Sequence, residues 1–475
     1  MHEEEKELAT DRLLEVLRAD VEEEVEVNLE DKNVSVPLSD KEVQAILATK
    51  DSKKEEKKKR GFSIPKQKID YKKFLNFAIS KLKRLVIEKD GYIGLDIGNN
   101  NIKYVILKHS GKDVILEGYG IHPYRTGNLN QEKVQEELLH TLSLAITSDK
   151  KKLYNIVTSV FGQKVAIKNV TLPKVAKAEL RDAIIWNAKK DLPFPIEQSM
   201  VDYKILGEVS EKGVPKLSSV VAIADQEIIQ THLEQLKKTD TIPTRVIIVP
   251  LAIYNAFYFF TEKSQIKNGV VIDIGSSNTY MIFISEGNLQ FAREIGIGGE
   301  DVTKGLIGSI STDVGVVNID REFAEKLKTD VGIADENDFA LYKEGISNSQ
   351  AGMMMKPTLE KLASQIQRTF DYYRSKFPKS EPEKVYISGG TAAMNNFTPF
   401  LTEALGREVI VLNPFEYVKV SDKITNKEDL DKAVPFLSVA FGNAIDEKRG
   451  LNLLPPEIQI IPLLNFQKRI FIRAY

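Results

Sequence analysis

The chain has 475 residues, 42% of them hydrophobic, and a formal net charge of −2. That length allows about three domain-sized units of roughly 150 residues each, and the nearly balanced charge gives no indication of nucleic-acid binding. The absence of cysteine excludes disulfides, thiolate catalysis and zinc-finger sites, and five scattered histidines do not predict a metal site. The N-terminus has no signal-peptide pattern and no run of about 18 apolar residues predicts a membrane span, so a soluble cytoplasmic protein is expected.

Residues 1–90 predict a charged, largely disordered extension. Residues 1–31 carry 13 acidic against 3 basic side chains, whereas residues 51–90 carry 14 basic against 6 acidic ones. A capping box at Ser39 indicates a short helix between these two parts. The basic stretch 70–88 has apolar residues at helical spacing, which fits either a helix on an anionic membrane surface or one packed against protein.

The sequence from residue 91 onward predicts a sheet with helices packed on it. We expect a first lobe over residues 91–163, beginning with an antiparallel meander, and an inserted subdomain over residues 164–240. The first lobe is predicted to contain strands at 92–96, 102–107, 114–119 and 155–161 and a helix at 132–146. The inserted subdomain is predicted to contain strands at 164–172 and 220–224 and helices at 177–190 and 226–237.

The remaining sequence predicts a second lobe over residues 241–447, which also returns to the first lobe, and a C-terminal tail over residues 448–475. The predicted elements of the second lobe are strands at 245–249, 270–273 and 384–388, a helix from Leu251, and helices at 301–310, 321–328 and 358–377. The last of these helices has Leu359, Leu362 and Ile366 on one face, which indicates that this face is buried.

Two polar turns with the same pattern each follow an apolar strand. Asp96 and Gly98 belong to the first turn, and Asp273 and Gly275 belong to a second turn 177 residues later. A carboxylate at a strand end can face Mg²⁺ through water, and a glycine lets backbone N–H groups approach phosphate oxygens. One such turn also fits an ordinary hairpin bend, but the pair predicts two related halves that hold one phosphate chain. The candidate residues are Asp96, Gly98, Asn99, Asn100, Asn101 and Lys103 in the first turn and Asp273, Gly275, Ser276, Ser277, Asn278 and Thr279 in the second, with Asp96 and Asp273 for Mg²⁺.

Two glycine pairs add weaker signals. One pair follows a predicted strand, where it would let a flat base or sugar approach, although a plain turn fits as well. The other precedes a helix, where it would present N–H groups to a phosphate or simply cap that helix. The candidate residues are Gly389, Gly390 and Thr391 at the first pair and Gly298, Gly299 and Asp301 at the second.

In this order, the two turns and the two glycine pairs resemble the actin/Hsp70/sugar-kinase ATPase superfamily. Residues 440–444 lie where that superfamily places its second connecting helix, and the resemblance covers residues 91–445. It implies an α/β actin-like ATPase fold, with two duplicated lobes around a nucleotide cleft that holds ATP and Mg²⁺.

Two segments are more specific and resemble the FtsA/PilM branch of that superfamily. Residues 324–328 are similar to its A-E-x-x-K segment, which implies that Glu325 and Lys328 contact the ribose and base of ATP. Residues 180–203 resemble the inserted subdomain of the PilM family, although Asn187 replaces its usual Glu and puts one polar contact in doubt. The resemblance implies a cytoplasmic ATP-binding scaffold or switch of the type IV pilus, or a related type II secretion, assembly platform, held peripherally at the inner membrane.

The tail carries a clue to a partner. Leu451, Asn452, Leu453, Leu454 and Pro455 resemble the I-N-L-L-P segment that begins the PilN family, whose N-terminal peptide sits in a PilM groove. Either this segment fills the chain's own groove or a neighbour's, or it is an ordinary strand end. The resemblance implies a PilN-like membrane partner, with PilO-, PilC- or PilB-like platform and motor proteins as further candidates, and it leaves self-association open.

Two other functions fit the same superfamily. A small-molecule kinase would need an acidic general base beside its substrate, for which Asp202 and Asp225 are the candidates. An FtsA-like cell-division adaptor would need an amphipathic membrane helix at its end, and residues 467–475 are a poor version of one. We therefore expect a nucleotide-binding scaffold with slow or absent ATP turnover.

Overall fold

The computed structural model describes residues 91–455, apart from 112, 125–130, 177, 191, 212, 265 and 446–449, together with Ile458. The predicted extension 1–90 and nearly all of the tail after residue 455 lie outside these residues. The described residues up to Leu454 belong to one compact unit, and Pro455 belongs to a second one. Within the described part of the chain, no helix has the length and apolar character needed to cross a membrane.

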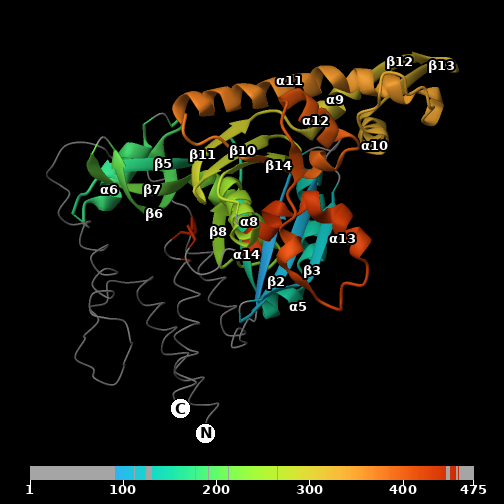
Figure 1. Ribbon diagram of the computed structural model, residues 1–475. Helices are drawn as coiled ribbons and strands as arrows, with labels where there is room; N and C mark the ends of the chain where they lie inside the picture. The colour runs from blue at the N-terminus through green and yellow to red at the C-terminus, as the bar shows by residue number, and fades with distance from the viewer. Residues whose placement is uncertain are drawn as a thin grey trace, which may run out of the picture. The chain divides into compact units, whose positions relative to one another are not determined.

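Two sheets with the same internal order form the two lobes (Figure 1). The first lobe has the order β16 (Lys419–Val420), β3 (Asp113–Pro123), β2 (Asn101–Ser110), β1 (Gly91–Ile97), β4 (Tyr154–Val160) and β8 (Arg245–Ile248). The second lobe has the order β11 (Asn288–Ile295), β10 (Thr279–Ser285), β9 (Gly269–Ile274), β14 (Lys384–Ser388) and β15 (Val409–Val411). In each sheet the first strand of an antiparallel meander also pairs in parallel with a later strand, β1 with β4 and β9 with β14. The meander predicted for the first lobe is therefore repeated in the second.

Helices cover both sheets and bury their apolar faces there. In the first lobe, Leu138 and Leu142 of α4 (Gln131–Ala145) pack with Ile93 and Leu95 of β1 on one face, and α14 (Ser438–Ile445) lies on the other. In the second lobe, Figure 1 shows α11 (Asn348–Lys376) lying along the sheet, and its Phe370 joins the core of that lobe. The other helices are α5 (Ser148–Leu153), α9 (Gly299–Leu306), α10 (Arg321–Val331), α12 (Phe397–Leu405) and α13 (Lys427–Ala433).

Helix α8 (Val249–Ser264) serves both lobes at once. Phe259 packs with Phe441 of α14 in the core of the first lobe, with ring centroids 5.3 Å apart. Its neighbours Phe257 and Phe260 pack against Tyr386 of β14 in the second lobe, at 5.3 and 5.4 Å. Because successive residues face opposite lobes, this helix must be apolar around most of its circumference, as its sequence is.

A three-stranded sheet with the order β5 (Val165–Pro173), β7 (Val214–Asp225) and β6 (Ser199–Glu211) forms the inserted subdomain, together with α6 (Leu180–Ala188) and α7 (Gln226–Lys238). The chain enters it from β4 and returns to β8, so it is covalently part of the first lobe. It also touches the second lobe, because the Asn169 amide on β5 donates to the Leu289 and Gln290 carbonyls of β11 at 2.7 and 2.9 Å.

Two predicted elements need correction, and a strand of the inserted subdomain was missed. Helix α11 begins at Asn348 and not at residue 358, because Ser347 and Gln350 form a capping box there and the helix continues through Pro357. Pro357 is exposed, so water can satisfy the carbonyl that its missing N–H leaves free. Helix α9 ends at Leu306 and not at residue 310, because β12 (Gly308–Thr312) and β13 (Gly315–Ile319) form a hairpin. Strand β6 was not predicted at all.

Close backbone approach fixes α14 between β1 and α8. A Cβ atom on Gly442 would lie 1.8 Å from the Ala252 carbonyl oxygen of α8, and one on Gly94 would lie 1.8 Å from the Ala440 carbonyl oxygen. Both obstacles are backbone atoms, which cannot rotate away as a side chain would. Glycine is therefore required on both sides of this helix.

We expect Gly442→Ala to lower the free energy of unfolding by roughly 1–3 kcal/mol. Alanine is favoured over glycine in a helix by about 1 kcal/mol, but a 1.8 Å contact forces α14 and α8 apart and outweighs that gain. Urea unfolding followed by circular dichroism measures the difference. Gly296→Ala is the matched control, because its Cβ would meet nothing within 4 Å; equal stability of the two variants would contradict the packing argument.

Candidate functional site

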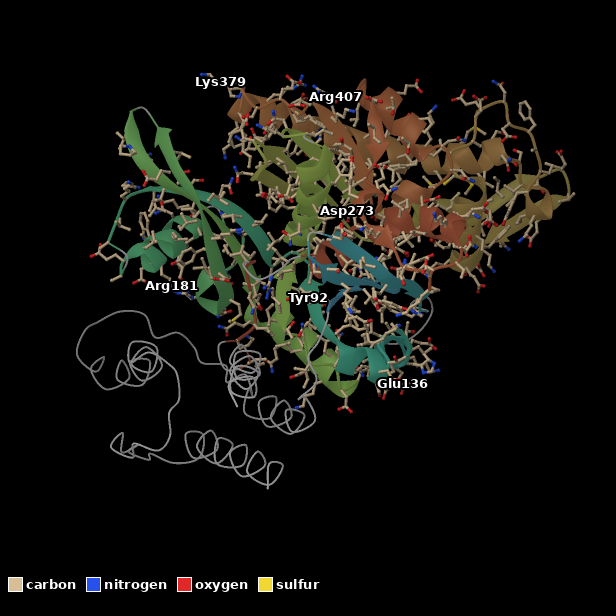
Figure 2. All side chains as sticks on the ribbon, turned by 60° about the horizontal axis from the view of Figure 1, so that its bottom comes forward. Tyr92, Glu136, Arg181, Asp273, Lys379 and Arg407 are labelled. Atoms are coloured by element: carbon tan, nitrogen blue, oxygen red, sulfur yellow. The ribbon has the colours of Figure 1, made fainter. Side chains whose placement is uncertain are left out.

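A cleft of about 540 Å³ lies between the two lobes, where the turns after β1 and β9 meet. Figure 2 shows the labelled Asp273 at this junction, beside the blue strands of the first lobe. Of the residues predicted from the sequence, those that line the cleft are Asp96, Gly98, Asn99, Asn100, Asn101, Lys103, Asp273, Gly275, Ser276, Ser277, Asn278, Gly299, Glu325, Lys328, Gly389, Gly390 and Thr391. The structure thus brings together residues that are up to 295 positions apart, from Asp96 to Thr391.

The two turns have the same geometry and touch each other. In the first turn the Gly98 N–H donates to the Asn101 carbonyl at 3.1 Å, and in the second the Gly275 N–H donates to the Asn278 carbonyl at 3.0 Å. The Asn99 amide then donates across the cleft to the Ser277 hydroxyl at 2.7 Å. Each turn follows the first strand of its own sheet, so the duplication of the sheets is what places the two turns opposite each other.

The two carboxylates of these turns are buried alike but paired differently. Asp96 accepts a charged hydrogen bond from Lys103 at 2.8 Å, whereas Asp273 accepts from the Ser388 hydroxyl at 2.6 Å. Both residues are only 6% exposed. Burial raises the pKa of Asp273 to about 6 from an ordinary value of 3.8; Ser388 and Lys103 oppose this shift, and the Asp96 charge adds to it.

A bound cation would balance the negative charge of the two buried carboxylates, Asp96 and Asp273. The described residues contain no group of three or more histidine and carboxylate side chains that could cage a metal ion directly. Mg²⁺ does not need one, because it keeps several waters and binds through one or two carboxylates together with substrate phosphates. Asp96 and Asp273, buried beside small polar turns, fit that role as partners of the water shell.

The Gly-Gly segment at the start of α9 supports the second turn. The N–H groups of Gly299 and Glu300 donate to the Gly275 and Ser276 carbonyls at 2.9 and 2.7 Å. A Cβ on Gly298 would lie 2.4 Å from the Ser276 carbonyl oxygen, so this position requires glycine. The segment therefore supports the second turn from behind, and its Gly299 also lines the cleft.

Three predicted site residues lie behind the lining of the cleft. Gly298 makes the close contact just described, and its N–H donates to the Asp301 carboxylate at 2.9 Å. Thr279 is fully buried and donates to the Ile297 carbonyl at 2.8 Å. The Asp301 carboxylate therefore caps the N-terminus of α9.

In the second lobe, Lys328 and its hydrogen-bond partners form a polar part of the cleft wall. This side chain is 7% exposed, and its ammonium donates to Glu325 at 2.8 Å, to Thr303 at 2.9 Å and to the Gly299 carbonyl at 3.3 Å. The Thr303 hydroxyl also donates to Glu325 at 2.6 Å. Glu325 and Lys328 are thus held one helical turn apart at the rim of the cleft.

The segment after β14, also in the second lobe, supplies two glycines that form a slot beside an aromatic ring. Gly389 has a φ of +88°, and a Cβ there would lie 2.3 Å from the Ile274 carbonyl oxygen. A Cβ on Gly390 would lie 3.0 Å from the Phe436 ring, so a side chain there would crowd the ring. The Gly389 N–H donates to the Pro435 carbonyl at 2.7 Å, which fixes the slot to the segment before α14.

Sequence reasoning missed several lining residues. Phe436 and Glu300 are the informative ones, since Phe436 faces Gly390 and Glu300 makes a two-bond ion pair with Arg321 at 3.0 and 2.8 Å. Glu300 adjoins the predicted Gly-Gly pair and could have been included, but nothing in the spacing around Phe436 signals its position. The remaining lining residues are Phe161, Val249, Tyr280, Thr329, Ala393, Met394, Asp431, Lys432, Pro435 and Val439.

The other predicted residues lie outside the cleft. The Asp225 carboxylate caps α7 by accepting from the Glu227 N–H at 2.9 Å and pairs with Lys164 at 3.3 Å. Asp202 accepts from the Tyr203 N–H at 2.9 Å and from the Asn452 N–H at 2.8 Å. Both candidate kinase bases are therefore committed elsewhere. Leu451, Asn452, Leu453 and Leu454 run beside β8, and Pro455 falls in the other compact unit.

The comparisons with known proteins agree with this geometry. A family model described as type IV pilus assembly protein PilM matches residues 94–448. The chain belongs to the PilM family. A solved PilM–PilN type IV pilus biogenesis complex has a TM-score of 0.60 and 24% sequence identity to it, and the match covers 75% of this chain and 98% of that one. The family match and this likeness confirm the predicted actin-like fold with two duplicated lobes.

Two further proteins to which this PilM-family chain is similar have other names. The cell division protein FtsA of Bacillus subtilis (strain 168) is 21% identical over 366 residues, which are 70% of this chain and 80% of FtsA. A structure of MreB 5 of Spiroplasma citri bound to AMPPNP has a TM-score of 0.41 and 13% identity, and covers 76% of this chain and 97% of that one.

The raised pKa of Asp273 predicts a pH dependence of stability. Between its unfolded value of 3.8 and its folded value of about 6, the folded protein holds the Asp273 proton more tightly, so the contribution of this group to stability is fully present below the window and is lost as the pH rises through it. At 1.36 kcal/mol per unit, the loss above about pH 6 is at most about 3 kcal/mol. We expect Asp273→Asn, which keeps an acceptor for Ser388, to raise stability near pH 7.5 and to flatten its dependence between about pH 5 and 7.5.

Urea unfolding at both pH values, without nucleotide and with a chelator present, measures this effect. Asp371→Asn serves as the control, because that carboxylate is exposed on α11. An Asp273→Asn variant no more stable than wild type near neutral pH would show that the carboxylate carries no electrostatic penalty.

Proposed function

We propose that this PilM-family protein is an ATP-binding scaffold or switch of the type IV pilus inner-membrane assembly platform. The observation that carries the proposal is the pair of matching turns, which face each other across one cleft and are joined by the bond from Asn99 to Ser277. Backbone N–H groups and small polar side chains from both lobes meet there, as binding of a phosphate chain requires.

Each wall of the cleft then has a part in holding ATP. The turns at Gly98 and Gly275 would hold the phosphates, with Lys103 as a nearby cation and with Asp96 and Asp273 ordering the water shell of Mg²⁺. Mg²⁺ bound with the nucleotide would supply positive charge that offsets these carboxylates and the phosphates. The slot at Gly389 and Gly390 and the rim at Glu325 and Lys328 would receive the base and ribose, because glycine beside the Phe436 ring leaves room for a flat base and the ion pair offers hydrogen-bonding groups.

The same residues argue for slow or absent turnover. Hydrolysis requires a base that orients or deprotonates the attacking water. Among the described residues, five carboxylates line the cleft. Asp96 is paired with Lys103, Glu325 with Lys328 and Glu300 with Arg321, and a carboxylate held by a cation is a weak base. Asp273, which accepts from the Ser388 hydroxyl, would be engaged with hydrated Mg²⁺, and Asp431 is exposed on α13. Binding energy here would therefore serve to position the two lobes and not to cleave phosphate.

Bound nucleotide would act as a switch through contacts that both lobes share. ATP touching both turns favours the closed arrangement of the lobes by its differential affinity for that arrangement. The inserted subdomain is continuous with the first lobe and hydrogen-bonded to the second through Asn169, so closure would also set its position. A partner bound at the inserted subdomain would in this way sense the nucleotide.

The partner that best fits this scaffold is a PilN-like inner-membrane protein, bound through its cytoplasmic N-terminal peptide. The support is the family membership and the likeness to a solved PilM–PilN complex. PilO-, PilC- and PilB-like proteins, self-association and a type II secretion platform are extensions of the same proposal. Peripheral attachment to the inner membrane would follow from the PilN-like partner, with the protein itself on the cytoplasmic side.

Isothermal titration calorimetry with ATP and Mg²⁺ tests nucleotide binding. We expect saturable heat with the wild-type protein, and at least about tenfold weaker binding for Asp273→Asn, a loss of about 1.4 kcal/mol. The physical reason is that the amide cannot attract the hydrated cation. Asp371→Asn should bind as the wild type does.

The expected stability of Asp273→Asn sharpens the test. A variant that is more stable than the wild type yet binds ATP less cannot owe its defect to misfolding. Neither heat nor a thermal shift for the wild type at millimolar ATP and Mg²⁺ would refute the proposal.

A further inference from the structure

Residues 451–454 form a short extended segment that is docked by its own main chain. The Leu453 N–H donates to the Val246 carbonyl of β8 at 2.8 Å, and the Val246 N–H donates to the Asn452 side-chain oxygen at 3.2 Å. The Asn452 N–H donates to the Asp202 carboxylate of β6 at 2.8 Å. One side of the segment therefore contacts the first lobe and the other contacts the inserted subdomain.

The β8 edge needs an occupant of this kind. Strand β8 is the last strand of its sheet, so among the described strands its outer edge has no partner. Val246 is fully buried, yet both of its outward backbone groups would lack a hydrogen bond without the segment. A buried unpaired N–H or C=O costs about as much as a lost hydrogen bond, so the empty groove would be strained or would admit water or another peptide.

The contacts of Asn452 explain why the segment requires an asparagine at this position. Its side-chain oxygen accepts from the Val246 N–H at 3.2 Å and from the Leu454 N–H at 3.1 Å, so one amide satisfies the strand edge and turns the segment at once. The leucines on both sides, Leu451, Leu453 and Leu454, are 3%, 1% and 0% exposed. The contacts define a linear pattern of an apolar residue, asparagine and two leucines.

We propose that residues 451–454 are a peptide ligand carried in cis, which fills a groove that also accepts the same pattern from a partner. The polar contacts described above come from three consecutive residues, 452–454, through a strand edge and a side-chain acceptor. That is the mode by which sheets recognise extended peptides. The groove is thus closed to a partner until its own segment leaves, and the segment acts as a built-in competitor.

Tethering sets how strong this competition is. A ligand joined by a short linker has an effective concentration in the millimolar range. A free peptide with equal intrinsic affinity therefore occupies half of the grooves only at about that concentration. A membrane partner presenting the pattern would need extra contacts, or a state of the protein in which the segment is released. The proposal rests on the proposed function only for the identity of that partner.

Fluorescence anisotropy with a labelled peptide of the chain's own residues 449–457 tests the competition in the full chain, without nucleotide. We expect weak binding to the wild type and at least about tenfold tighter binding to Asn452→Ala, because about two hydrogen bonds of the internal ligand are lost while the groove stays intact. Asn318→Ala, an exposed asparagine on β13, is the matched control and should bind as the wild type does.

Two further arms identify the groove. A labelled peptide with alanine in place of its asparagine should bind Asn452→Ala much less, and the double variant Asp202→Ala/Asn452→Ala should lose most of the gain. Equal peptide affinity for wild type and Asn452→Ala would overturn the proposal. A mass by light scattering that falls from dimer to monomer in Asn452→Ala would overturn occupancy in cis and assign the segment to a second copy.

Hydrogen exchange on the wild type keeps the proposal testable if Asn452→Ala does not fold. Saturating unlabelled peptide should speed exchange at the amides of Leu453 and Leu454 while Val246 stays protected. Unchanged slow exchange of the segment would mean that it is fixed core and not a displaceable ligand. Because nucleotide is absent throughout, a failure here is independent of whether ATP binds.

Discussion

The contact of backbone with backbone on both sides of α14 is the constraint on which the remaining architecture depends. Gly94 and Gly442 leave no room for a side chain, so β1, α14 and α8 stack without a gap. Asn443, fully buried on α14, extends this fixation by donating to the Leu95 carbonyl and the Ser159 hydroxyl at 2.9 and 3.0 Å. Since α8 is packed against both sheets, the same stack sets where the turn after β9 stands relative to the turn after β1. The position of the cleft therefore depends first on helix packing, and the polar residues only then line it.

The two carboxylates of the cleft differ in their partners. One is paired with a lysine and the other is not, and this arrangement suits a cation that binds together with an anion. Lys103 neutralises Asp96 within the first turn, whereas Asp273 has a hydroxyl donor and a raised pKa. The protein therefore tolerates an unfavourable buried carboxylate in this cleft. Functional sites commonly carry such a cost, which a bound ligand relieves.

The two turns could be predicted from local sequence patterns. Other features of the site and fold could not, because they depend on contacts between residues far apart in the sequence. Asp96 and Asp273 could be found because a strand, an acidic residue and a glycine are adjacent in sequence. Phe436 could not, because its place beside Gly390 is decided by tertiary packing across a separation of 46 positions. The start of α11 was missed because Pro357 ordinarily ends a helix, and only its exposure makes it tolerable here. Asn452 was recognised by its neighbours in sequence, but its acceptor role depends on Val246, 206 residues away.

The inserted subdomain contacts the sheets of both lobes. Its Asn169 holds the edge of the second lobe's sheet at β11, and its Asp202 holds residue 452 against the edge of the first lobe's sheet at β8. Both sheets have one edge at this small domain, so in this structure each of these two edges is covered from within the chain. Any rotation of one lobe against the other must break or bend the bonds at Asn169 or shift Asp202 relative to Val246. The groove beside β8 and the cleft between the turns are therefore parts of one mechanical system, although they are built from different residues.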